Sequence, residues 1–582
     1  MNYNLHQFPS PRKPSGLKTL LSLITHEKRN LVITSLAILV NCFLNLSGPY
    51  IIGYTIDNFL ITGKYHGVVA ISGLLLIIYI IIFFTSYLQG RLMGNIGQKL
   101  IYKLRNRIFS KLQELPITFF QQNKSGDLIA RINHDTEKLD VFFSQYLTQL
   151  ASSIALISGV SIFMLSLHLK LGLVTLAPAF IIFLFTKLLS PWTQSKNSLS
   201  LKIAGDLSAQ VKESLDNFEV MVAFNRRDYF RKRLATAYQK SYQSNLYTGL
   251  ANNIFFPVYN LLSGFAQLGV LVYGINLVMT GELTIGLLVS FTTYCINFYN
   301  PLKQLANYWT NFQLAMAAWE RISHVLSMET NLKHVTTSQT VQSSAFIEFK
   351  QVNFEYCDGR KILKDINLKL IKGKKYALIG PTGGGKTTAA SLMARLYDPT
   401  TGIILLDGKD IREYDCIERS QKIGFILQEP FLFNGTVKDN ILYGNQYYSN
   451  YDHENLKLLL KEKNIEELLS FFDEGLNTNI SSLGKDISLG LIQVIAFIRA
   501  VLRNPEILIL DEATANIDTV TEQYLQKIID HLPEDITLVT IAHRLNTIQD
   551  ADEIFFVNHG NITLVGSFEE AVTKLKQELN PQ

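Results

Sequence analysis

Residues 375–396 read KYALIGPTGGGKTTAASLMARL, an apolar strand-like run, a glycine-rich turn and a helical pattern in direct succession. The turn fits the G-x-x-x-x-G-K-T pattern of a phosphate-binding loop, which needs that strand before it and that helix after it. Glycines let backbone N–H groups point at phosphate oxygens, and the helix N-terminus adds its dipole. In such a loop Lys386 reaches the outer phosphates, and the Thr387 hydroxyl binds Mg²⁺. We therefore expect ATP to be bound by Gly380, Thr382, Gly383, Gly384, Gly385, Lys386, Thr387 and Thr388.

A second strand carries the acidic residues that this loop requires. Ile507-Leu-Ile-Leu-Asp511-Glu512 is a run of four apolar residues followed by two carboxylates. We expect Asp511 to hold the Mg²⁺ shell and Glu512 to polarise the attacking water. The alternative, an ordinary acidic strand end, is much less favoured beside such a loop. Further β-rich runs alternate with helical segments after residue 345, which predicts a parallel sheet in an α/β domain.

The first 330 residues differ in composition, because they contain long apolar runs without charged residues. Hydrophobic residues make up 47% of the chain and charged residues 18%, which is too apolar for an ordinary cytosolic protein. A bilayer core needs about 20 apolar helical residues, and long runs without charge occur only in this half. Buried helices of a soluble protein rarely repeat at that length, so we predict a membrane domain. The six expected transmembrane helices span about 31–56, 66–90, 144–167, 171–192, 254–278 and 283–302.

Charge and composition organise the chain further. Lys and Arg cluster before the first span and after the second, which predicts that both segments are cytoplasmic. Loops 91–140 and 190–250 are polar and helical in pattern, so the spans should continue as helices on that side. The net charge of +5 gives no reason to expect nucleic acid as a partner. The expected regions are a flexible tail (1–16), a transmembrane domain (17–328), a linker (329–345) and a nucleotide-binding domain (346–582).

The motifs of the second half resemble the nucleotide-binding domain of ATP-binding cassette (ABC) transporters. By this resemblance Tyr356, in Val-Asn-Phe-Glu-Tyr356, stacks on adenine, although alone it would be only a strand tyrosine. Gln428, in Phe-Ile-Leu-Gln428-Glu-Pro, touches Mg²⁺ and senses the transmembrane domain, and Asp518, in Ala-Asn-Ile-Asp518, matches the D-loop. His543, in Ile-Ala-His543-Arg, matches the switch histidine at the γ-phosphate. The resemblance thus implies ATP and Mg²⁺ as cofactors, catalysis by Glu512, His543 and Gln428, and metal binding by Thr387, Gln428 and Asp511.

The first half resembles the exporter type of the same family over nearly its full length. Leu115-Pro-x-x-Phe-Phe120 followed by Gly126-Asp-Leu-Ile-Ala-Arg131 looks like the first intracellular loop, whose short coupling helix rests on a nucleotide-binding domain. The implied fold is a multi-domain membrane protein. It has a six-helix all-α transmembrane domain with long cytoplasmic helical extensions, then an α/β P-loop nucleotide-binding domain with a helical subdomain.

Six spans with one ATPase make a half-transporter in this family, and two halves are needed. The implied function is ATP-driven export, and the implied partners are a second half-transporter, membrane lipid and a small substrate. The expected location is the bacterial plasma membrane, with the nucleotide-binding domain in the cytoplasm.

One motif departs from the family. The signature Leu-Ser-Gly-Gly-Gln, which caps the ATP held by the opposite subunit, stands here as Ile487-Ser-Leu-Gly-Leu491. Leu489 replaces a glycine that lets the backbone approach, and Leu491 cannot hydrogen-bond as glutamine does. Ser488 and Gly490 remain as the residues that can act on the partner's ATP.

Two interpretations of this signature compete. Drift in a homodimer would leave both ATP sites poorly capped, whereas specialisation in a heterodimer pairs this complete Walker site with a partner whose signature is intact. Drift should spread damage over all motifs, and only one is altered here, so we favour the heterodimer. A regulatory membrane subunit that binds ATP but turns over little is an alternative from another class.

The substrate is only weakly specified. The spans carry no buried acid that would attract a cation, and the candidate cavity residues are polar or aromatic but uncharged, which suggests an amphiphilic cargo. The same side chains can instead hold helices together. The candidate cavity residues are Asn41, Asn45, Tyr294, Asn297, Tyr299, Asn300, Gln304, Asn307 and Tyr308.

Overall fold

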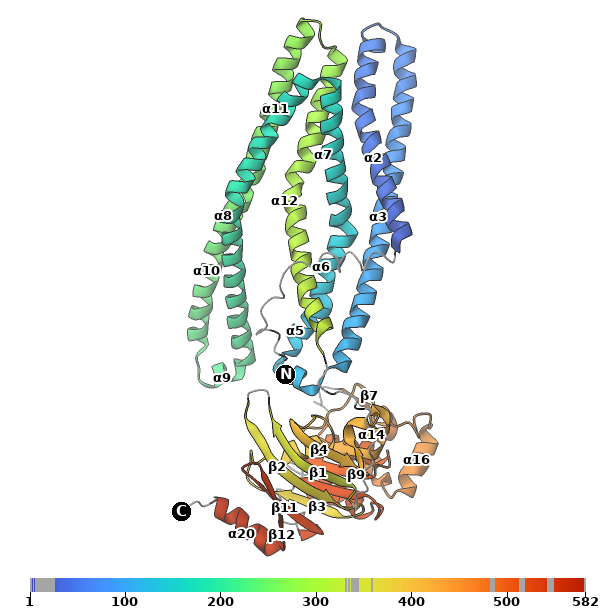
Figure 1. The fold of residues 1–582 in the computed structure, drawn as a ribbon, viewed down its shortest axis with the longest axis vertical. Helices are drawn as coiled ribbons and strands as arrows, with labels where there is room; N and C mark the ends of the chain where they lie inside the picture. The colour runs from blue at the N-terminus through green and yellow to red at the C-terminus, as the bar shows by residue number, and fades with distance from the viewer. Residues whose placement is uncertain are drawn as a thin grey trace. The chain divides into compact units, whose positions relative to one another are not determined.

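The chain forms two units, a helical one and one built around β-sheets (Figure 1). The helical unit holds residues 9–113 and 125–327, and the other holds residues 1–8, 114–124 and 328–582. The computed structural model describes Tyr3, Leu5 and residues 27–329, 332, 335, 345–356, 359–481, 487–511, 519–541 and 549–579. Within the predicted tail it thus describes Tyr3 and Leu5, which are both buried.

Long helices make up the first unit. Three short π-helical turns, at Ile56–Leu60, Arg131–Asp135 and Phe142–Tyr146, continue α2, α5 and α6 without a break. The 50-residue α3 is about 75 Å long at 1.5 Å per residue, more than twice a bilayer core of about 30 Å. The helices are α2 (Lys28–Thr55), α3 (Tyr65–Glu114), α5 (Ser125–Ala130), α6 (Thr136–Val141), α7 (Leu147–Leu167), α8 (Leu169–Asp216), α9 (Phe218–Ala223), α10 (Arg227–Asn253), α11 (Phe255–Met279) and α12 (Ile285–Ser327).

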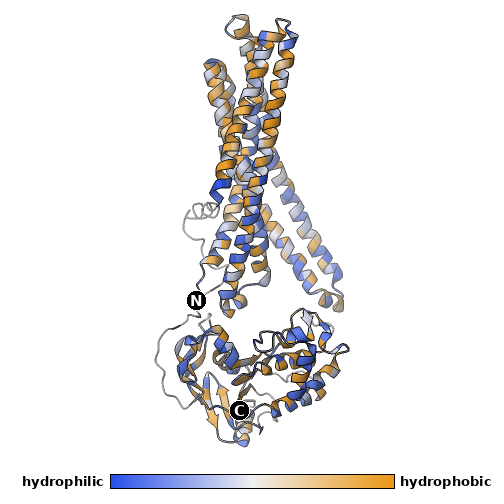
Figure 2. Cartoon of the chain, turned by 90° about the vertical axis from the view of Figure 1, so that its right-hand side faces the viewer, coloured by the Kyte–Doolittle hydropathy of each residue, from blue (hydrophilic) through white to orange (hydrophobic). Residues whose placement is uncertain are grey.

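Five helical stretches in the described part of the chain are long and apolar enough to cross a membrane. They are Lys28–Leu60, Tyr65–Glu114, Ser125–Leu167, Leu169–Asp216 and Arg227–Met279. Figure 2 shows mostly hydrophobic residues toward the α2–α3 connection and more hydrophilic ones toward α9. The sixth predicted span, 283–302, falls largely on α12, whose asparagines lower its apolar character, and its crossing of the membrane stays a prediction.

A close approach joins α2 to α12. A Cβ added at Gly53 would lie 2.4 Å from the Gly286 carbonyl oxygen, so the two backbones meet where neither residue has a side chain. Asp57 accepts a hydrogen bond from the Gly286 N–H (2.8 Å), and the Ser290 hydroxyl donates to the Pro49 carbonyl (2.8 Å). Small residues and hydrogen bonds of this kind hold helices together where lipid gives no hydrophobic drive between them.

The described residues of the second unit form three sheets, the smallest of which pairs β7 with β8. A four-stranded antiparallel sheet has the order β2-β1-β4-β5, and a six-stranded sheet has the order β12-β11-β3-β10-β9-β6. The strands β11, β3, β10, β9 and β6 are parallel, which confirms the α/β expectation. The strands are β1 (Ile347–Glu355), β2 (Lys361–Leu370), β3 (Lys375–Ile379), β4 (Thr401–Leu406), β5 (Lys409–Asp410), β6 (Ile423–Ile426), β7 (Gly435–Thr436), β8 (Asn479–Ile480), β9 (Ile507–Asp511), β10 (Thr537–Ile541), β11 (Glu553–Asn558) and β12 (Asn561–Val565).

Two large apolar cores lie in the described part of this unit, beside a smaller cluster between β3, β11, β12 and the C-terminal helix α20. One packs the antiparallel sheet and α13 against β3, and the other gathers α15, α16, α17 and α18 beside β9. Every residue of β9 is buried, as expected for a strand covered on both faces. The helices are α4 (Ile117–Gln122), α13 (Lys386–Met393), α14 (Cys416–Lys422), α15 (Val437–Ile441), α16 (His453–Glu462), α17 (Leu489–Val501), α18 (Thr519–Asp530) and α20 (Phe568–Leu579).

Candidate functional site

The parallel sheet brings three of the predicted motifs to one edge. The phosphate loop starts at Gly380, directly after β3 ends, and Asp511 is the last residue of β9. Gln428 follows the end of β6 by two residues, and its side chain is exposed. Strand β9 pairs with both β10 and β6, and β10 pairs with β3, all in parallel. The carboxyl ends of these strands therefore share the edge at which ligands bind in open α/β sheets.

The backbone of the loop requires glycine where it passes β11. Gly380 has φ +145°, and a Cβ there would lie 2.0 Å from the carbonyl oxygen of Val557. Gly385 has φ +115° and immediately precedes α13, so the helix N-terminus opens onto the loop. A Cβ at Gly383 would meet nothing within 4 Å, which leaves that side of the loop open. Sequence reasoning missed Val557, because only the folded sheet places its carbonyl beside the loop.

The polar groups at this edge fit a nucleotide with a divalent cation. The buried Lys386 ammonium donates to the carbonyls of Gly380 (2.9 Å) and Pro381 (3.1 Å), so it already lies along the loop that would carry phosphates. The Thr387 hydroxyl donates to Asp511 Oδ1 (3.2 Å). A hydroxyl and a carboxylate in contact are oxygen ligands of the kind that Mg²⁺ prefers. Thr382 lies on the exposed side of the same loop.

Tyr356 lies beside the phosphate-loop helix. Its hydroxyl is 3.1 Å from the Thr388 hydroxyl, and its ring packs edge-on against the rings of Phe354 and Tyr397, with centroids 4.9 and 5.7 Å away. The Tyr397 hydroxyl donates to Gln121 of α4 (2.9 Å). Sequence reasoning missed Tyr397, because a single tyrosine after a helix carries no motif, and only its packing relates it to Tyr356.

The structure places the altered signature at the start of α17. Ser488 is the N-cap, and its hydroxyl accepts the N–H of Leu491 (3.3 Å). Leu489 is 45% exposed, whereas Leu491 packs against the apolar core. A Cβ at Gly490 would lie 3.1 Å from the Thr521 side chain, so helix packing is a second reason for glycine there. Glu512, Asp518 and His543 lie outside the described residues.

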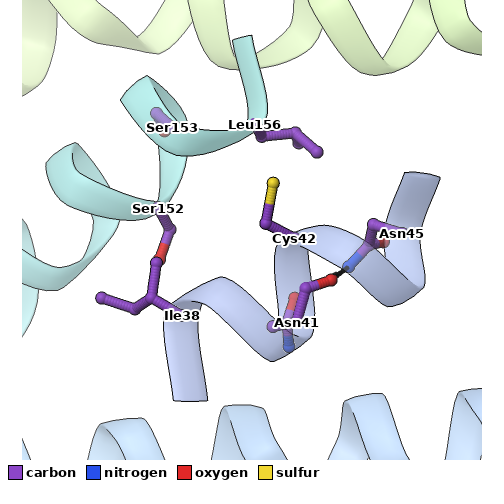
Figure 3. A pocket seen from close by; sticks show the side chains of 7 residues that line it. All are labelled: Ile38, Asn41, Cys42, Asn45, Ser152, Ser153 and Leu156. Atoms are coloured by element: carbon purple, nitrogen blue, oxygen red, sulfur yellow. Dashed lines mark hydrogen bonds between the residues drawn. The ribbon is translucent and has the colours of Figure 1, made fainter. Parts of the chain in front are cut away.

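A small cavity lies in the helical unit, between α2 and α7 (Figure 3). Its volume is about 110 Å³, and two of the predicted cavity residues, Asn41 and Asn45, line it. Asn41 Nδ2 donates to the hydroxyls of Thr85 (3.1 Å) and Ser86 (2.9 Å) on α3, and Asn45 Nδ2 donates to Asn41 Oδ1 (2.7 Å). The full lining is Ile38, Asn41, Cys42, Asn45, Ser152, Ser153 and Leu156.

The remaining predicted cavity residues divide into two groups. Tyr294 and Tyr299 are fully buried, and their hydroxyls donate to the carbonyls of Leu46 (2.6 Å) and Thr175 (2.8 Å), which agrees with a role in holding helices together. Tyr308 is likewise buried and hydrogen-bonds to Gln304. Asn297 is half-buried, whereas Asn300, Gln304 and Asn307 are exposed on α12.

Comparisons with known proteins agree with this architecture. The profile of the ABC transporter transmembrane region matches residues 31–302, and the ABC transporter profile matches residues 363–515. The chain is 33% identical over 562 residues to the uncharacterized ABC transporter ATP-binding protein YfiC of Bacillus subtilis, covering 96% of this chain and 92% of that protein. It is 29% identical to a multidrug resistance ABC transporter of Lactococcus lactis subsp. lactis (96% and 94% covered). It is 30% identical to the ATP-dependent lipid A-core flippase of Syntrophus aciditrophicus (98% and 94% covered). The chain therefore belongs to the ABC transporter family, as a multi-pass exporter of the bacterial plasma membrane that couples ATP hydrolysis to transport.

Proposed function

We propose that this chain is the half of a heterodimeric exporter that carries the competent Walker motifs and that its substrate is amphiphilic or hydrophobic. The observation that carries the heterodimer is the contrast between its motifs. Lys386, Thr387 and Asp511 form a complete set at one sheet edge, whereas Leu489 and Leu491 remove the polar chemistry of the signature. The substrate class is supported by relatives named as multidrug, fatty acid and lipid A-core transporters.

The local structure of the signature supports this division of labour. A capping loop offers a hydroxyl, backbone N–H groups and a glutamine to the opposite ATP. Here the Ser488 hydroxyl accepts the Leu491 N–H of its own helix, and the Leu491 side chain belongs to the core of its own unit. An exposed Leu489 adds a bulky apolar group at the helix start. Such a surface caps phosphates poorly, so the ATP site that it completes should turn over little.

In the site built on this chain's own Walker motifs, we assign Lys386 to the outer phosphates and Tyr356 to adenine. Thr387, Asp511 and Gln428 would hold Mg²⁺, which neutralises charge that develops on the phosphates. Glu512 would orient the attacking water, and His543 would contact the γ-phosphate. Asp518 would lie at the junction of the two halves.

The second half-transporter would also cover exposed apolar residues on α9. Phe218, Val220, Val222 and the adjoining Phe224 are all exposed, the last to 74%. This six-residue helix joins α8 to α10 at the end of the unit rich in hydrophilic residues (Figure 2). We assign it to the partner's nucleotide-binding domain, and we assign residues 115–131 to coupling with this chain's own domain.

The exposed face of α12 supports the substrate assignment. Asn300, Gln304 and Asn307 recur at the i, i+4 and i+7 spacing of one helix face, and all three are exposed. Uncharged polar groups flanked by exposed apolar side chains such as Ile296 and Trp309 suit a cargo with a small polar part and a large apolar part. We propose that α12 is the sixth span and that this face lines the transport path together with the Asn41 cavity.

ATPase measurements on purified protein test the pairing. We expect the chain alone to hydrolyse ATP at background rates, and the chain with its partner to be active. Leu489→Gly combined with Leu491→Gln rebuilds the signature, so the chain alone should gain activity, whereas the activity of the heterodimer should change little. Activity of the unaltered chain alone would support the homodimer, and inactivity of both preparations would support the low-turnover regulatory subunit.

Transport assays address the substrate class. Inverted vesicles with the active pair should accumulate a fluorescent fatty acid or a short-chain phospholipid when ATP is supplied. Accumulation of a small hydrophilic solute in place of these probes would contradict the amphiphilic assignment.

A further inference from the structure

Tyr3 and Leu5 lie against the end of α4. This helix ends at Gln122, and its C-cap residue Asn123 is 6% exposed. The Asn123 Nδ2 group donates to the Tyr3 carbonyl (2.9 Å), and its Oδ1 accepts the N–H of Leu5 (3.0 Å). An amide offers both donors and an acceptor, so this one side chain pairs with the main chain of two residues that are distant in sequence.

Tyr3 adds contacts of its own. Its N–H donates to Gln122 Oε1 (2.7 Å), and its ring meets the fully buried Phe119 ring edge-on at 6.4 Å between centroids. Its hydroxyl donates to the carbonyl of Glu329 (3.1 Å). Tyr3 is 3% exposed and Leu5 is 8% exposed, so the burial of both is nearly complete.

The contacted residues lie where the chain passes between its two units. Residues 114–124, which include α4, belong to the nucleotide-binding unit although α3 and α5 on either side belong to the helical one. Glu329 follows the end of α12 at Ser327, where the chain enters the nucleotide-binding unit for the last time. Tyr3 therefore connects residues 114–124 to the start of residues 328–582 of that unit, through hydrogen bonds to Gln122 and Glu329.

The same helix has a second attachment to the unit. Gln121 accepts a hydrogen bond from Tyr397, whose ring packs against Tyr356. Consecutive helical residues point about 100° apart, so the neighbouring Gln122 is available to a different partner, Tyr3. Tyr397 thus contacts Gln121 of α4. Tyr3 and Leu5 contact the last residue of the helix, Gln122, and its C-cap residue, Asn123.

We propose that Tyr3 and Leu5 form a latch that keeps α4 attached to the nucleotide-binding unit during the transport cycle. With α4 held, a movement of that unit passes through the chain to α3 and α5. Without the latch, α4 retains only its remaining contacts, and part of each ATP-driven movement is lost before it reaches the membrane helices. Tyr3 and Asn123 are thus positioning residues for coupling. The proposal rests on the coupling role assigned above to residues 115–131.

The test compares variants of the full-length transporter in lipid vesicles. Tyr3→Ala removes the ring contact and the bond to Glu329, Tyr3→Phe removes only that bond, and Asn123→Ala removes both main-chain pairs. Tyr447→Ala is the matched control, because it deletes a 62% exposed tyrosine from the same unit. Three quantities are measured: amide hydrogen exchange in residues 1–8 and in α4, the ATPase rate, and flux of a fluorescent short-chain phosphatidylethanolamine per ATP hydrolysed.

We expect slow exchange of the Tyr3 and Leu5 amides in the parent and fast exchange in the Asn123→Ala variant. Flux per ATP should fall about five-fold in Tyr3→Ala, a loss at the lower end of typical coupling effects, with the ATPase rate retained. Tyr3→Phe should retain most of the parent's flux per ATP, and the Tyr447→Ala control should match the parent.

Unprotected amides at Tyr3 and Leu5 in the parent would overturn the latch, and so would undiminished flux per ATP in both Tyr3→Ala and Asn123→Ala. If the parent does not carry the lipid, the proposed substrate class is wrong. The exchange measurement needs no substrate, so protection or its loss still decides whether the latch exists.

Discussion

At the scale of single residues, the sequence assigns side chains to phosphate and metal because a contiguous loop carries most of them, and the structure brings Thr387 of that loop into contact with Asp511. The Thr387–Asp511 contact joins two motifs that are 124 positions apart, and the strand contexts alone were enough to pair them. Val557 and Tyr397 could not be predicted in this way. Their roles depend on which strand lies beside the loop and which ring packs on Tyr356, and neither fact is local in sequence.

The position of Tyr356 allows a direct test of nucleotide stacking. Replacing it by Ala should weaken ATP binding by about 1–3 kcal/mol, roughly five-fold to 150-fold in Kd, because the aromatic face is lost. Tyr356→Phe keeps the face and loses only the hydroxyl contact to Thr388, so it should bind nearly as the parent does. Titration with a fluorescent ATP analogue gives both constants. An unchanged affinity in the Ala variant would leave Tyr356 as a packing residue of the β1 region.

At the scale of elements, helices and strands were predictable where their patterns are local. The apolar runs predicted the membrane helices, and the polar loops after them predicted that these helices continue well beyond a bilayer, as the 50 residues of α3 confirm. The order of strands in the six-stranded sheet was not predictable, because it depends on which segments pair across the chain. Helix α12 mixes polar and apolar residues and does not meet the criterion of length and apolar content that the five other helical stretches meet, so its crossing stays a prediction.

Three strands of the site are joined at their opposite, amino-terminal ends by one carboxylate. Glu506 precedes β9 and accepts hydrogen bonds from Lys372, ahead of β3 (2.6 Å), and Lys422, ahead of β6 (2.5 Å). Burial acts to raise the pKa of Glu506, but the hydrogen bonds and charges of the two lysines outweigh it and hold the pKa below the ordinary 4.5. The triad thereby ties together the amino-terminal ends of the strands that lead to the phosphate loop, Gln428 and Asp511.

This lowered pKa gives a pH dependence with a definite sign. A carboxyl whose folded pKa is depressed contributes stability above about 4.5, and loses it as pH falls through the folded value. Amide exchange of β6 and β9, corrected for intrinsic rates, should therefore speed up below pH 5 in the parent. Glu506→Gln should show faster exchange already at neutral pH, because losing these partly exposed ion pairs lowers the free energy of opening by roughly 1 kcal/mol. Its exchange should also depend less on acid. Glu462→Gln, at an exposed site on α16, is the control. Equal acid responses in the parent and Glu506→Gln would exclude the triad as their source.

At the scale of the whole molecule, the proposed exporter needs two chains. In the proposed function, the signature at Ser488 and Gly490 acts on another chain's nucleotide, and the second half covers the exposed Phe218 and Phe224. The resemblance to the family implies that a second half is needed, since in that family the signature and the Walker motifs of one chain serve different ATP sites. The sequence of this chain does not specify which protein is the second half. It allows only the inference that the partner has an intact signature and a substituted Walker B carboxylate.

The heterodimer makes an asymmetric prediction about catalysis. Glu512→Gln preserves shape and removes the carboxylate that orients water, so ATPase activity of the pair should fall about 100-fold or more while ATP binding persists. The partner should carry an intact Leu-Ser-Gly-Gly-Gln and a substituted carboxylate at the position that corresponds to Glu512. Changing that partner residue to Ala should leave most of the activity, because Leu489 and Leu491 of this chain already cap that ATP site poorly.

Equal losses of ATPase activity from the two substitutions would mean that both sites hydrolyse ATP. Recovery of an active homodimer on a tagged chain would remove the need for a partner. Since each site borrows its cap from the other chain, activity in the pair with an intact Glu512 depends on the partner's signature and not on this one.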